Sequence, residues 1–320
     1  MDSARPDISV SIVSYNTRDL LRACLLSLQA RQAEGEATLE IIVADNGSTD
    51  GSPEMVLAEF SGVRLVRTGG NIGYGRANNA ALEEATGRYF FVLNSDTEVE
   101  PGALAALRGF MDAHPTVGAA GAQLILPDGT TQASCATDPS LRAVFWEQTY
   151  LDKLLPGNRV TGAYAMTHWA YNETRAVEQV AGACLFVRRE AYGAIGGFDP
   201  AYFMYFEDTD FCIRLRKSGW PIWFVPQARI RHHLGASSGG DWRVRASMIA
   251  SYNQSRYYYY TRYGGRGRGL LLKMLTLLGA GLRWLAWSIA LVWRPAARDQ
   301  VQLFRDVWRR TWFMRIEKVL

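Results

Sequence analysis

The first half of the chain alternates short apolar segments with segments of helical periodicity, and this restricts the fold more than any other feature. The apolar segments predict strands at Ile8–Val13, Leu39–Asp45, Val63–Arg67 and Arg88–Asn94. Between them, apolar residues recur at helical spacing over Leu20–Leu28, a second helix is predicted from Tyr74 to Gly87, and another is predicted to open at Pro101. Alternating strands and helices predict an α/β fold with a doubly wound, mostly parallel sheet.

Polar residues follow three of these predicted strands, at the edge where such sheets bind ligands. Tyr15 and Asn16 come after the first strand, Asp45 ends the second, and Asn94 and Asp96 follow the fourth. Oxygen ligands such as Asp96 can hold Mg²⁺ or Mn²⁺ against a diphosphate. A polar loop before the next helix explains the same residues. Asp45 suits either a ribose contact or a turn before a helix cap.

A glycine-rich turn, GGNIGYGRANNAA, spans residues 69–81 and enters the second predicted helix. This shape suits an anion. Gly70, Gly73 and Gly75 do not have the G-x-G-x-x-G spacing of a dinucleotide reader, and the turn follows the third strand instead of the first. The sequence therefore disfavours a Rossmann dehydrogenase.

The segment MYFEDTDFCIRLRKSGW, residues 204–220, places three acids among aromatic residues. Glu207 and Asp210 share one helix face, with Asp210 able to pair with Arg214, while Asp208 points roughly 100° away. Stabilisation of a helix N-terminus accounts for Asp210 but poorly for Asp208. Asp208 is therefore the candidate general base.

The C-terminal segment is basic and rich in tryptophan. From Gly264 to Leu320 there are eleven Lys or Arg against three Asp or Glu, and five of the ten Trp. Its apolar stretch, Leu270–Trp293, is interrupted by Lys273 and Arg283, so it lacks the run of roughly 20 uncharged residues that spans a bilayer. The flanking Arg and Trp favour a helix in the membrane surface. A helix covering the protein's own core, a tilted span and a subunit interface are the alternatives.

The four cysteines are widely spaced, and the first residues are too polar for a signal peptide. Both features predict a reduced, cytoplasmic setting without zinc bound to cysteine.

Six motifs, taken in order, resemble glycosyltransferase family 2, whose members have the GT-A fold. These motifs are SIVSYN, DNGSTDG, NIGYGRANN, LNSDTEV, the segment from Val180 to Trp220, and HHLGASS. The resemblance covers about Ile8 to Ser238 and is strongest to rhamnosyltransferase-like enzymes of bacterial cell-surface polysaccharide synthesis. It implies an inverting, metal-assisted single displacement from a dTDP-, UDP- or GDP-linked sugar to a hydroxyl of a glycan or polyprenyl-linked acceptor.

The resemblance also implies roles for individual residues. Contacts with the nucleotide are expected from Tyr15, Asn16 and Asp45, with Asn71 and Asn78 nearby. Asp96 is the expected metal ligand, and Asn94 stands where the family often has the first Asp of a D-x-D signature. His232 matches H-x-x-G-x-S with Gly235 and Ser237 and is the second expected ligand of Mg²⁺ or Mn²⁺, with His233 in reserve. Asp208 is the expected base, and the acceptor side is expected at Gly182, Ala183 and Glu207.

The predicted organisation is a catalytic domain, residues 1–240, followed by a helical tail, residues 241–320. Within the first, residues 1–127 are expected to bind the nucleotide and residues 128–240, loop-rich up to Ala176, the acceptor. We expect an enzyme peripheral on the inner face of the cell membrane, open to homo-oligomerisation and without a nucleic-acid partner. A sugar nucleotidyltransferase is disfavoured because SYNTRDLL lacks a glycine-rich loop with a catalytic cation, and a non-catalytic binding protein because Asp96, Asp208 and His232 are retained.

Overall fold

The computed structural model describes residues 5–155, 157–233 and 241–315. The chain forms two compact units. The first unit comprises Met1–Asp138, Trp169–Pro200 and Glu207–Ser237, and the second comprises Pro139–His168, Ala201–Phe206 and Ser238–Leu320. The second unit thus takes in two segments from the middle of the chain besides the predicted tail.

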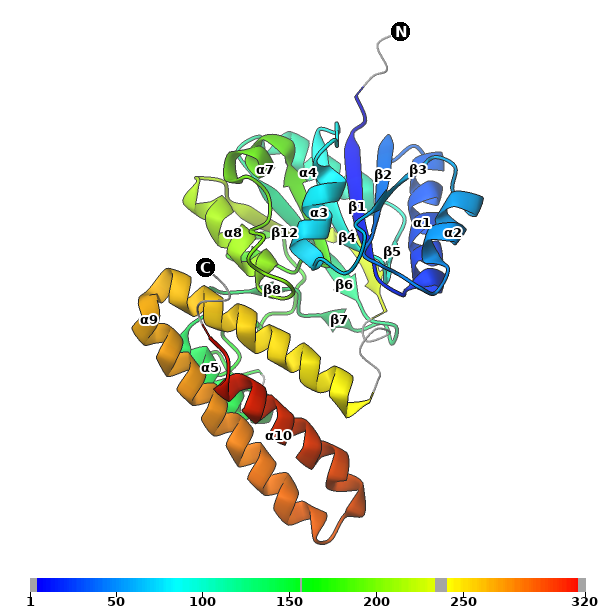
Figure 1. Ribbon diagram of the computed structural model, residues 1–320. Coiled ribbons are helices and arrows are strands. Elements are labelled where there is room, and N and C mark those ends of the chain that lie inside the picture. Colours follow the sequence, from blue (N-terminus) through cyan, green and yellow to red (C-terminus); the bar gives the residue numbers. More distant parts are fainter. Residues whose placement is uncertain (1–4, 156, 234–240, 316–320) are drawn as a thin grey trace. The chain divides into compact units, whose positions relative to one another are not determined.

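The first unit is built on one large twisted sheet (Figure 1). In spatial order its main strands are β3 (Val63–Arg67), β2 (Leu39–Asp45), β1 (Ile8–Ser14), β4 (Tyr89–Asn94), β11 (Cys184–Arg188), β6 (Ala119–Ile125), β12 (Ile222–His232) and β5 (Thr97–Val99). Two short strands join its side, β7 (Thr131–Gln132) on β6 and β9 (Arg175–Val177) on β12. A separate small pair consists of β8 (Cys135–Ala136) and β10 (Gln179–Val180).

Strands β3, β2, β1 and β4 run parallel, as predicted, and β11 enters antiparallel between β4 and β6. The sheet is therefore mixed, with its parallel pairs concentrated in the half that β3, β2, β1 and β4 form. The register sets Ser14 opposite Asp45 and Val13 opposite Asn94, so β1, β2 and β4 end together at one edge. This carboxyl edge carries the polar residues singled out from the sequence.

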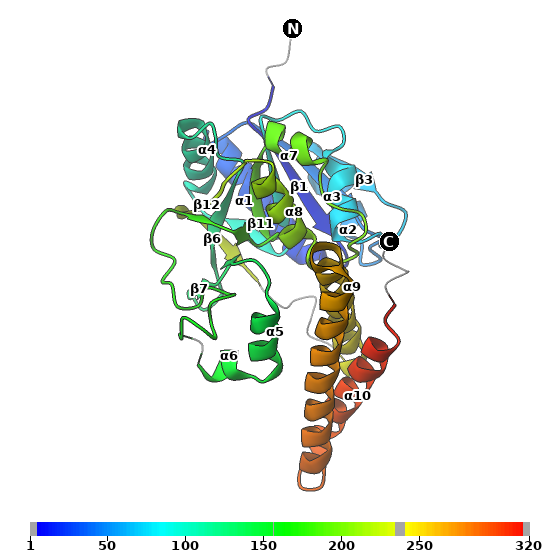
Figure 2. The same cartoon turned by 90° about the vertical axis from the view of Figure 1, so that its left-hand side faces the viewer.

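Helices cover both faces of this sheet (Figures 1 and 2). They are α1 (Arg18–Ala33), α2 (Ser52–Glu59), α3 (Tyr74–Leu82), α4 (Ala103–Ala113), α7 (Arg189–Ile195) and α8 (Glu207–Lys217). Alternate residues of β2 face opposite layers: Ile41 and Val43 join the core that contains α1 and α4, whereas Ile42 and Ala44 pack with α3. Both faces are thus buried, which explains the nearly continuous apolar sequence of β2.

Two predicted helices differ in their limits. Helix α3 ends at Leu82, five residues before Gly87. Helix α4 begins at Ala103 instead of Pro101, because the Glu36 carboxylate accepts hydrogen bonds from the backbone N–H groups of Gly102, Leu104 and Ala105 at 2.7–3.2 Å. A cap from a distant residue is not visible in the local sequence.

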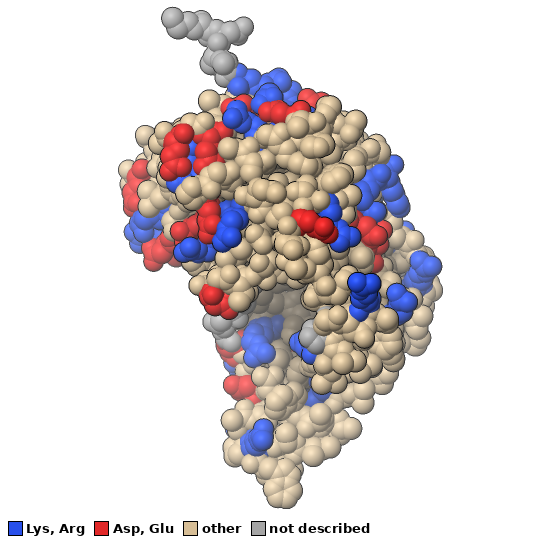
Figure 3. Space-filling view, turned by 180° about the vertical axis from the view of Figure 1, so that it is seen from behind, with Lys and Arg blue, Asp and Glu red and all other residues tan. Residues whose placement is uncertain are grey.

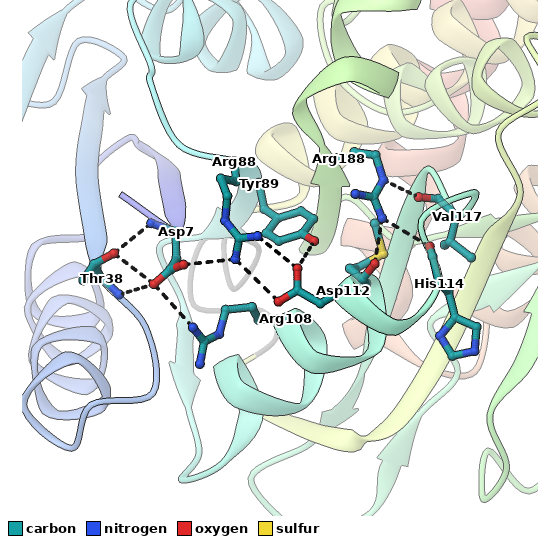
Figure 4. Close-up of polar contacts among 10 residues, drawn as sticks. Asp7, Thr38, Arg88, Tyr89, Arg108, Asp112, His114, Val117 and Arg188 are labelled. Atoms are coloured by element: carbon teal, nitrogen blue, oxygen red, sulfur yellow. Dashed lines mark hydrogen bonds and ion pairs between the residues drawn. The ribbon is translucent and has the colours of Figure 1, made fainter. Parts of the chain in front are cut away.

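The opposite, amino edge of the sheet is held by a polar cluster (Figure 4). Arg88 bridges Asp7, which precedes β1, and Asp112 of α4, each at 3.1 Å. Tyr89 donates to the same Asp112 carboxylate at 2.6 Å, and Arg188 donates to the carbonyl of Val117 at 3.0 Å. These contacts fix the starts of β1 and β4 against α4 and leave the other edge for ligands.

The second unit is helical. It contains α5 (Leu141–Gln148), α6 (Leu151–Leu154), α9 (Trp242–Leu291), a short 3₁₀ turn (Pro295–Ala297) and α10 (Arg298–Trp312). Helix α9 is interrupted by a non-helical backbone at Gly265, and its two arms and α10 share a small apolar core of Ala246, Ala280, Leu303 and Val307. Among the described residues, α9 is the one helix long and apolar enough to cross a membrane by length and composition.

Gly87 lies against the backbone of β1, and a substitution there tests this packing. A Cβ at Gly87 would lie 2.5 Å from the backbone nitrogen of Ser9, so Gly87→Ala should lower the free energy of unfolding by about 1–3 kcal/mol. Gly109→Ala in α4 is the matched control, because its Cβ meets no atom within 4 Å, and it should stabilise by about 0.5–1 kcal/mol. Urea titration measures both. Equal effects of the two substitutions would contradict this packing.

Candidate active site

The residues expected to contact the nucleotide lie at the carboxyl ends of β1 and β2. Asp45 is buried and accepts hydrogen bonds from the backbone N–H groups of Gly47 and Ser48 at 3.3 Å. Asn16, at φ 54°, accepts a hydrogen bond from Thr49 N–H at 2.8 Å. Tyr15 beside it is 48% exposed. One turn, residues 45–49, therefore brings the predicted residues of both strands together, with the Tyr15 ring free to stack on a planar ligand.

The asparagines of the glycine-rich turn have different surroundings. Asn71 is exposed and bonds Asn46 at 3.0 Å, which ties this turn to the end of β2. Asn78 is fully buried, accepts from Ser11 Oγ at 2.7 Å and donates to the Tyr74 carbonyl at 3.1 Å. Asn71 is thus accessible to a ligand, whereas the geometry of Asn78 favours a role in holding α3 on β1.

Asp96 and His232 are brought together although they are far apart in sequence. The Asp96 carboxylate lies 3.2 Å from His232 Nε2, because β5 and β12 pair at the same place. His232 Nδ1 lies 2.8 Å from Gln132 Oε1. When Nδ1 carries the proton and donates it to this oxygen, Nε2 presents a lone pair next to the carboxylate.

An imidazole nitrogen and a carboxylate oxygen at this spacing fit a divalent cation such as Mn²⁺. No three His, Cys, Asp or Glu side chains of the described residues converge on one point. Substrate oxygens would supply further ligands to such an ion. His233 is occupied differently, since its Nε2 lies 2.6 Å from Glu98. Gly235 and Ser237 of the same motif lie outside the described residues.

Asp208 stands at the N-terminus of α8, half-buried. Its carboxylate accepts the backbone N–H of Gly182 at 2.8 Å and that of Thr209 at 2.7 Å, and it forms no ion pair with any described residue. Burial raises the pKa of Asp208, and these hydrogen bonds oppose the rise. The neighbouring Asp210 is instead fully buried in an ion pair with Arg214 at 2.6 Å, as predicted.

Glu207 differs from Asp208 in its protonation. Burial, followed by the charge on Asp208, raises the pKa of Glu207 to about 8. Its Oε2 is buried and has no hydrogen-bond partner among the described residues. At neutral pH Glu207 therefore mostly holds a proton. A protonated acid beside a second carboxyl group is typical of sites with acid–base chemistry.

Tyr74 is the residue that sequence reasoning missed. Its hydroxyl lies 2.9 Å from both Asn94 Oδ1 and the Gly182 carbonyl oxygen. Burial, with added effects of Glu207, Asp208 and Asp96, raises its pKa well above the usual value, so the hydroxyl stays protonated. The Tyr74 hydroxyl has one proton and can donate it to only one of these two oxygens. When the Asn94 amide is turned so that its NH₂ faces Tyr74, the hydroxyl donates to the Gly182 carbonyl oxygen.

Gly182 and Ala183 lie between the two halves of this site. The Gly182 N–H holds Asp208, and the Ala183 carbonyl accepts the backbone N–H of Asn94 at 3.1 Å. A Cβ at Gly182 would lie 3.2 Å from the Cβ of Asp208, so only glycine allows this approach without displacement. A hydrogen-bonded path thus runs from the end of β4 through Gly182 to Asp208.

Comparison with known proteins agrees with this geometry. The family model described as "Glycosyl transferase family 2" matches residues 9–169. An N-acetylglucosaminyl-diphospho-decaprenol L-rhamnosyltransferase of Mycobacterium tuberculosis is 36% identical over 79% of this chain and 83% of its own length. Rhamnosyltransferase WbbL of Escherichia coli is 25% identical over 71% and 83%.

Among solved structures, the mannosyltransferase PcManGT from Pyrobaculum calidifontis, in complex with GDP-Man and Mn²⁺, superposes with a TM-score of 0.52. It covers 96% of this chain and 86% of that one at 18% identity, a likeness of fold. The family match and the mycobacterial relative carry the assignment further: the chain belongs to glycosyl transferase family 2 and is a nucleotide-sugar glycosyltransferase.

Proposed function

We propose that this enzyme transfers a deoxyhexose, rhamnose in the first instance, from a nucleoside diphosphate to a hydroxyl of a polyprenyl-diphosphate-linked N-acetylglucosamine. The similarity to the mycobacterial rhamnosyltransferase over most of both chains supports this substrate class. The observation that carries the chemistry is the Asp208 carboxylate, which is partly exposed, accepts two backbone N–H groups and forms no ion pair with described residues.

In this proposal the reaction is a single displacement. Asp208 takes the proton of the acceptor hydroxyl while that oxygen bonds the anomeric carbon, and the bond from this carbon to the diphosphate breaks on the opposite face. The nucleotide lies on Asp45, Asn16 and Tyr15. Protonated Glu207 adds no second negative charge beside the attacking oxygen.

Asp96 and His232 would hold a divalent cation, with Asn94 beside them. Such an ion, when bound, neutralises charge on the departing diphosphate. Gln132 keeps the His232 ring in its orientation through Nδ1.

Tyr74 acts as a positioning residue in this mechanism. Its hydroxyl fixes the carbonyl of the same Gly182 residue whose N–H holds Asp208. It therefore sets the direction of the base without touching the acceptor.

A lipid-linked acceptor would place the enzyme at the cytoplasmic face of the cell membrane. The basic, tryptophan-rich C-terminal segment supports this location, since each Lys or Arg near an anionic surface contributes about 1 kcal/mol.

Asp208→Asn should lower kcat about 10²–10⁴-fold, because the amide cannot accept the proton. Affinity for the nucleoside diphosphate should remain, as measured by calorimetric titration. Turnover by Asp208→Asn near that of the unmodified enzyme would exclude Asp208 as the base.

In the unmodified enzyme kcat should fall as pH is lowered through the Asp208 pKa, which burial places above that of an ordinary aspartate.

Tyr74→Phe should lower kcat about tenfold, the effect of one lost hydrogen bond, with the KM for the nucleotide sugar unchanged. Tyr192→Phe is the matched control, because it removes another tyrosine hydroxyl bonded to an asparagine, Asn79, at 2.8 Å. Its kcat should not change. A loss confined to KM, or equal losses in both variants, would exclude positioning by Tyr74.

Asp96→Asn should raise the Mn²⁺ concentration that gives half-maximal activity at least about tenfold, since it removes a charged ligand. Glu98→Gln, two residues away and bonded to His233, is the control and should change it little. Activity after treatment with a chelator and titration with MnCl₂ gives both values. Full activity of chelated enzyme would contradict the metal assignment.

A further inference from the structure

The second unit presents a long apolar face on the C-terminal arm of α9. The side chains concerned are Met274, Leu278, Leu282, Leu285, Ile289 and Val292, each 53–73% exposed. We name them the apolar stripe. Their steps of three or four residues put them on one side of the helix over about 27 Å. A soluble surface seldom exposes so much contiguous apolar area without a partner.

The two charges that interrupt this sequence are turned away from the apolar stripe. Lys273 donates to the carbonyl of Met314 at 2.9 Å. Arg283 donates to Gln148 at 2.8 Å, and its guanidinium lies 4.4 Å from the ring centroid of Tyr150. Both cations therefore make their contacts within the second unit. The exposed face of this helix arm carries no charged side chain from Leu270 to Trp293.

Exposed arginines lie at both ends of the apolar stripe: Arg266 and Arg268 before it, Arg294 and Arg298 after it. Trp293, 81% exposed, lies at one end as well. Cations and a tryptophan next to an apolar helix face match the headgroup and acyl layers of an anionic membrane. A protein partner would need acidic groups about 40 Å apart to meet the arginines at both ends, which is a more restrictive requirement than an anionic membrane surface.

Helix α10 decides between lying on the membrane and crossing it. It packs along the same arm of α9 through Leu303 and Val307, and its outer side exposes Arg305, Arg309 and Arg310 (Figures 1 and 2). A membrane-spanning α9 would carry these three arginines into the hydrocarbon, where charged side chains are strongly disfavoured. Figure 3 shows the lower end of α9 and α10 from behind, where most of the surface is tan and so belongs to residues other than Lys, Arg, Asp and Glu.

We propose that the apolar stripe lies flat in the surface of an anionic bilayer. The axis of the C-terminal arm of α9 then lies in the membrane plane, with α10 on the side of this arm that faces away from the lipid. This inference deepens the membrane location given under the proposed function and rests on it. It names the lipid-facing side chains and their orientation.

Flotation of the full chain with phosphatidylglycerol–phosphatidylethanolamine vesicles tests the contact. The double variant Leu278→Glu and Leu285→Glu should lower vesicle partitioning at least about a hundredfold, because two leucines that the proposal places in the lipid are lost. The double variant Leu26→Glu and Leu57→Glu is the matched control, with equally exposed leucines, 54% and 61%, on the first unit. It should bind like the unmodified chain. Unchanged flotation of the stripe variant would overturn the proposal. A stripe variant that binds vesicles normally but no longer self-associates would also overturn it, because the apolar stripe would then be a subunit interface.

Orientation is tested with a fluorophore on single cysteines at Met274, Leu282 or Ile289 and lipid quenchers at known depths. Equal, shallow depths at the three positions are expected. A Leu282 label near the bilayer centre with shallower labels at the other two would show a span and overturn the proposal.

Sugar transfer to a water-soluble, short-chain acceptor separates this inference from the proposed function. The stripe variant should keep that activity and lose transfer to an acceptor in vesicles. If no rhamnosyl transfer occurs even with the unmodified chain, the proposed function fails while vesicle binding still tests the apolar stripe. Equal activity of the stripe variant on both acceptors contradicts the inference.

Discussion

A base that works by proton abstraction must stay charged while it is drawn partly out of water beside a second acid. In the proposed mechanism Asp208 is this base, and the hydrogen bonds that it accepts from the backbone N–H groups of Gly182 and Thr209 oppose the rise in its pKa caused by burial. Glu207, which lacks such a bond at its Oε2, takes the proton instead. The proposed division of roles between the two acids thus depends on these backbone N–H groups, and Tyr74 in turn holds the carbonyl of Gly182.

The parallel half of the sheet was predictable because β1, β2 and β4 are largely buried and their sequences are therefore largely apolar. Strands β2 and β3 have the predicted limits, and the ends of β2 and β4 place Asp45 and Asn94 as expected. The antiparallel entry of β11 was not predictable, since it depends on pairing with residues 91 to 99 positions earlier. The same holds for Tyr74, whose contact with Gly182 spans 108 residues. Its only local signal is its place in the glycine-rich turn.

The C-terminal segment shows a different limit of sequence reasoning. When only the order of residues is known, Lys273 and Arg283 count against a membrane span but say nothing of which helix face is uncharged. Their partners, Met314 and Gln148, come from distant segments of the second unit, and their placement leaves an uncharged outer face. In the proposed arrangement the lipid-facing helix would bring the enzyme to an acceptor on a lipid carrier, and the first unit would bind the soluble donor.

The most direct measurement of the central claim is a crystal structure of the enzyme with a nucleoside diphosphate, Mn²⁺ and an acceptor analogue. An Asp208 carboxylate oxygen should lie about 2.6–3.2 Å from the acceptor hydroxyl, with the Gly182 N–H still bonded to the other oxygen. An acceptor hydroxyl on Glu207, or an Asp208 side chain turned away from the nucleotide that Asp45 and Asp96 surround, would contradict the account.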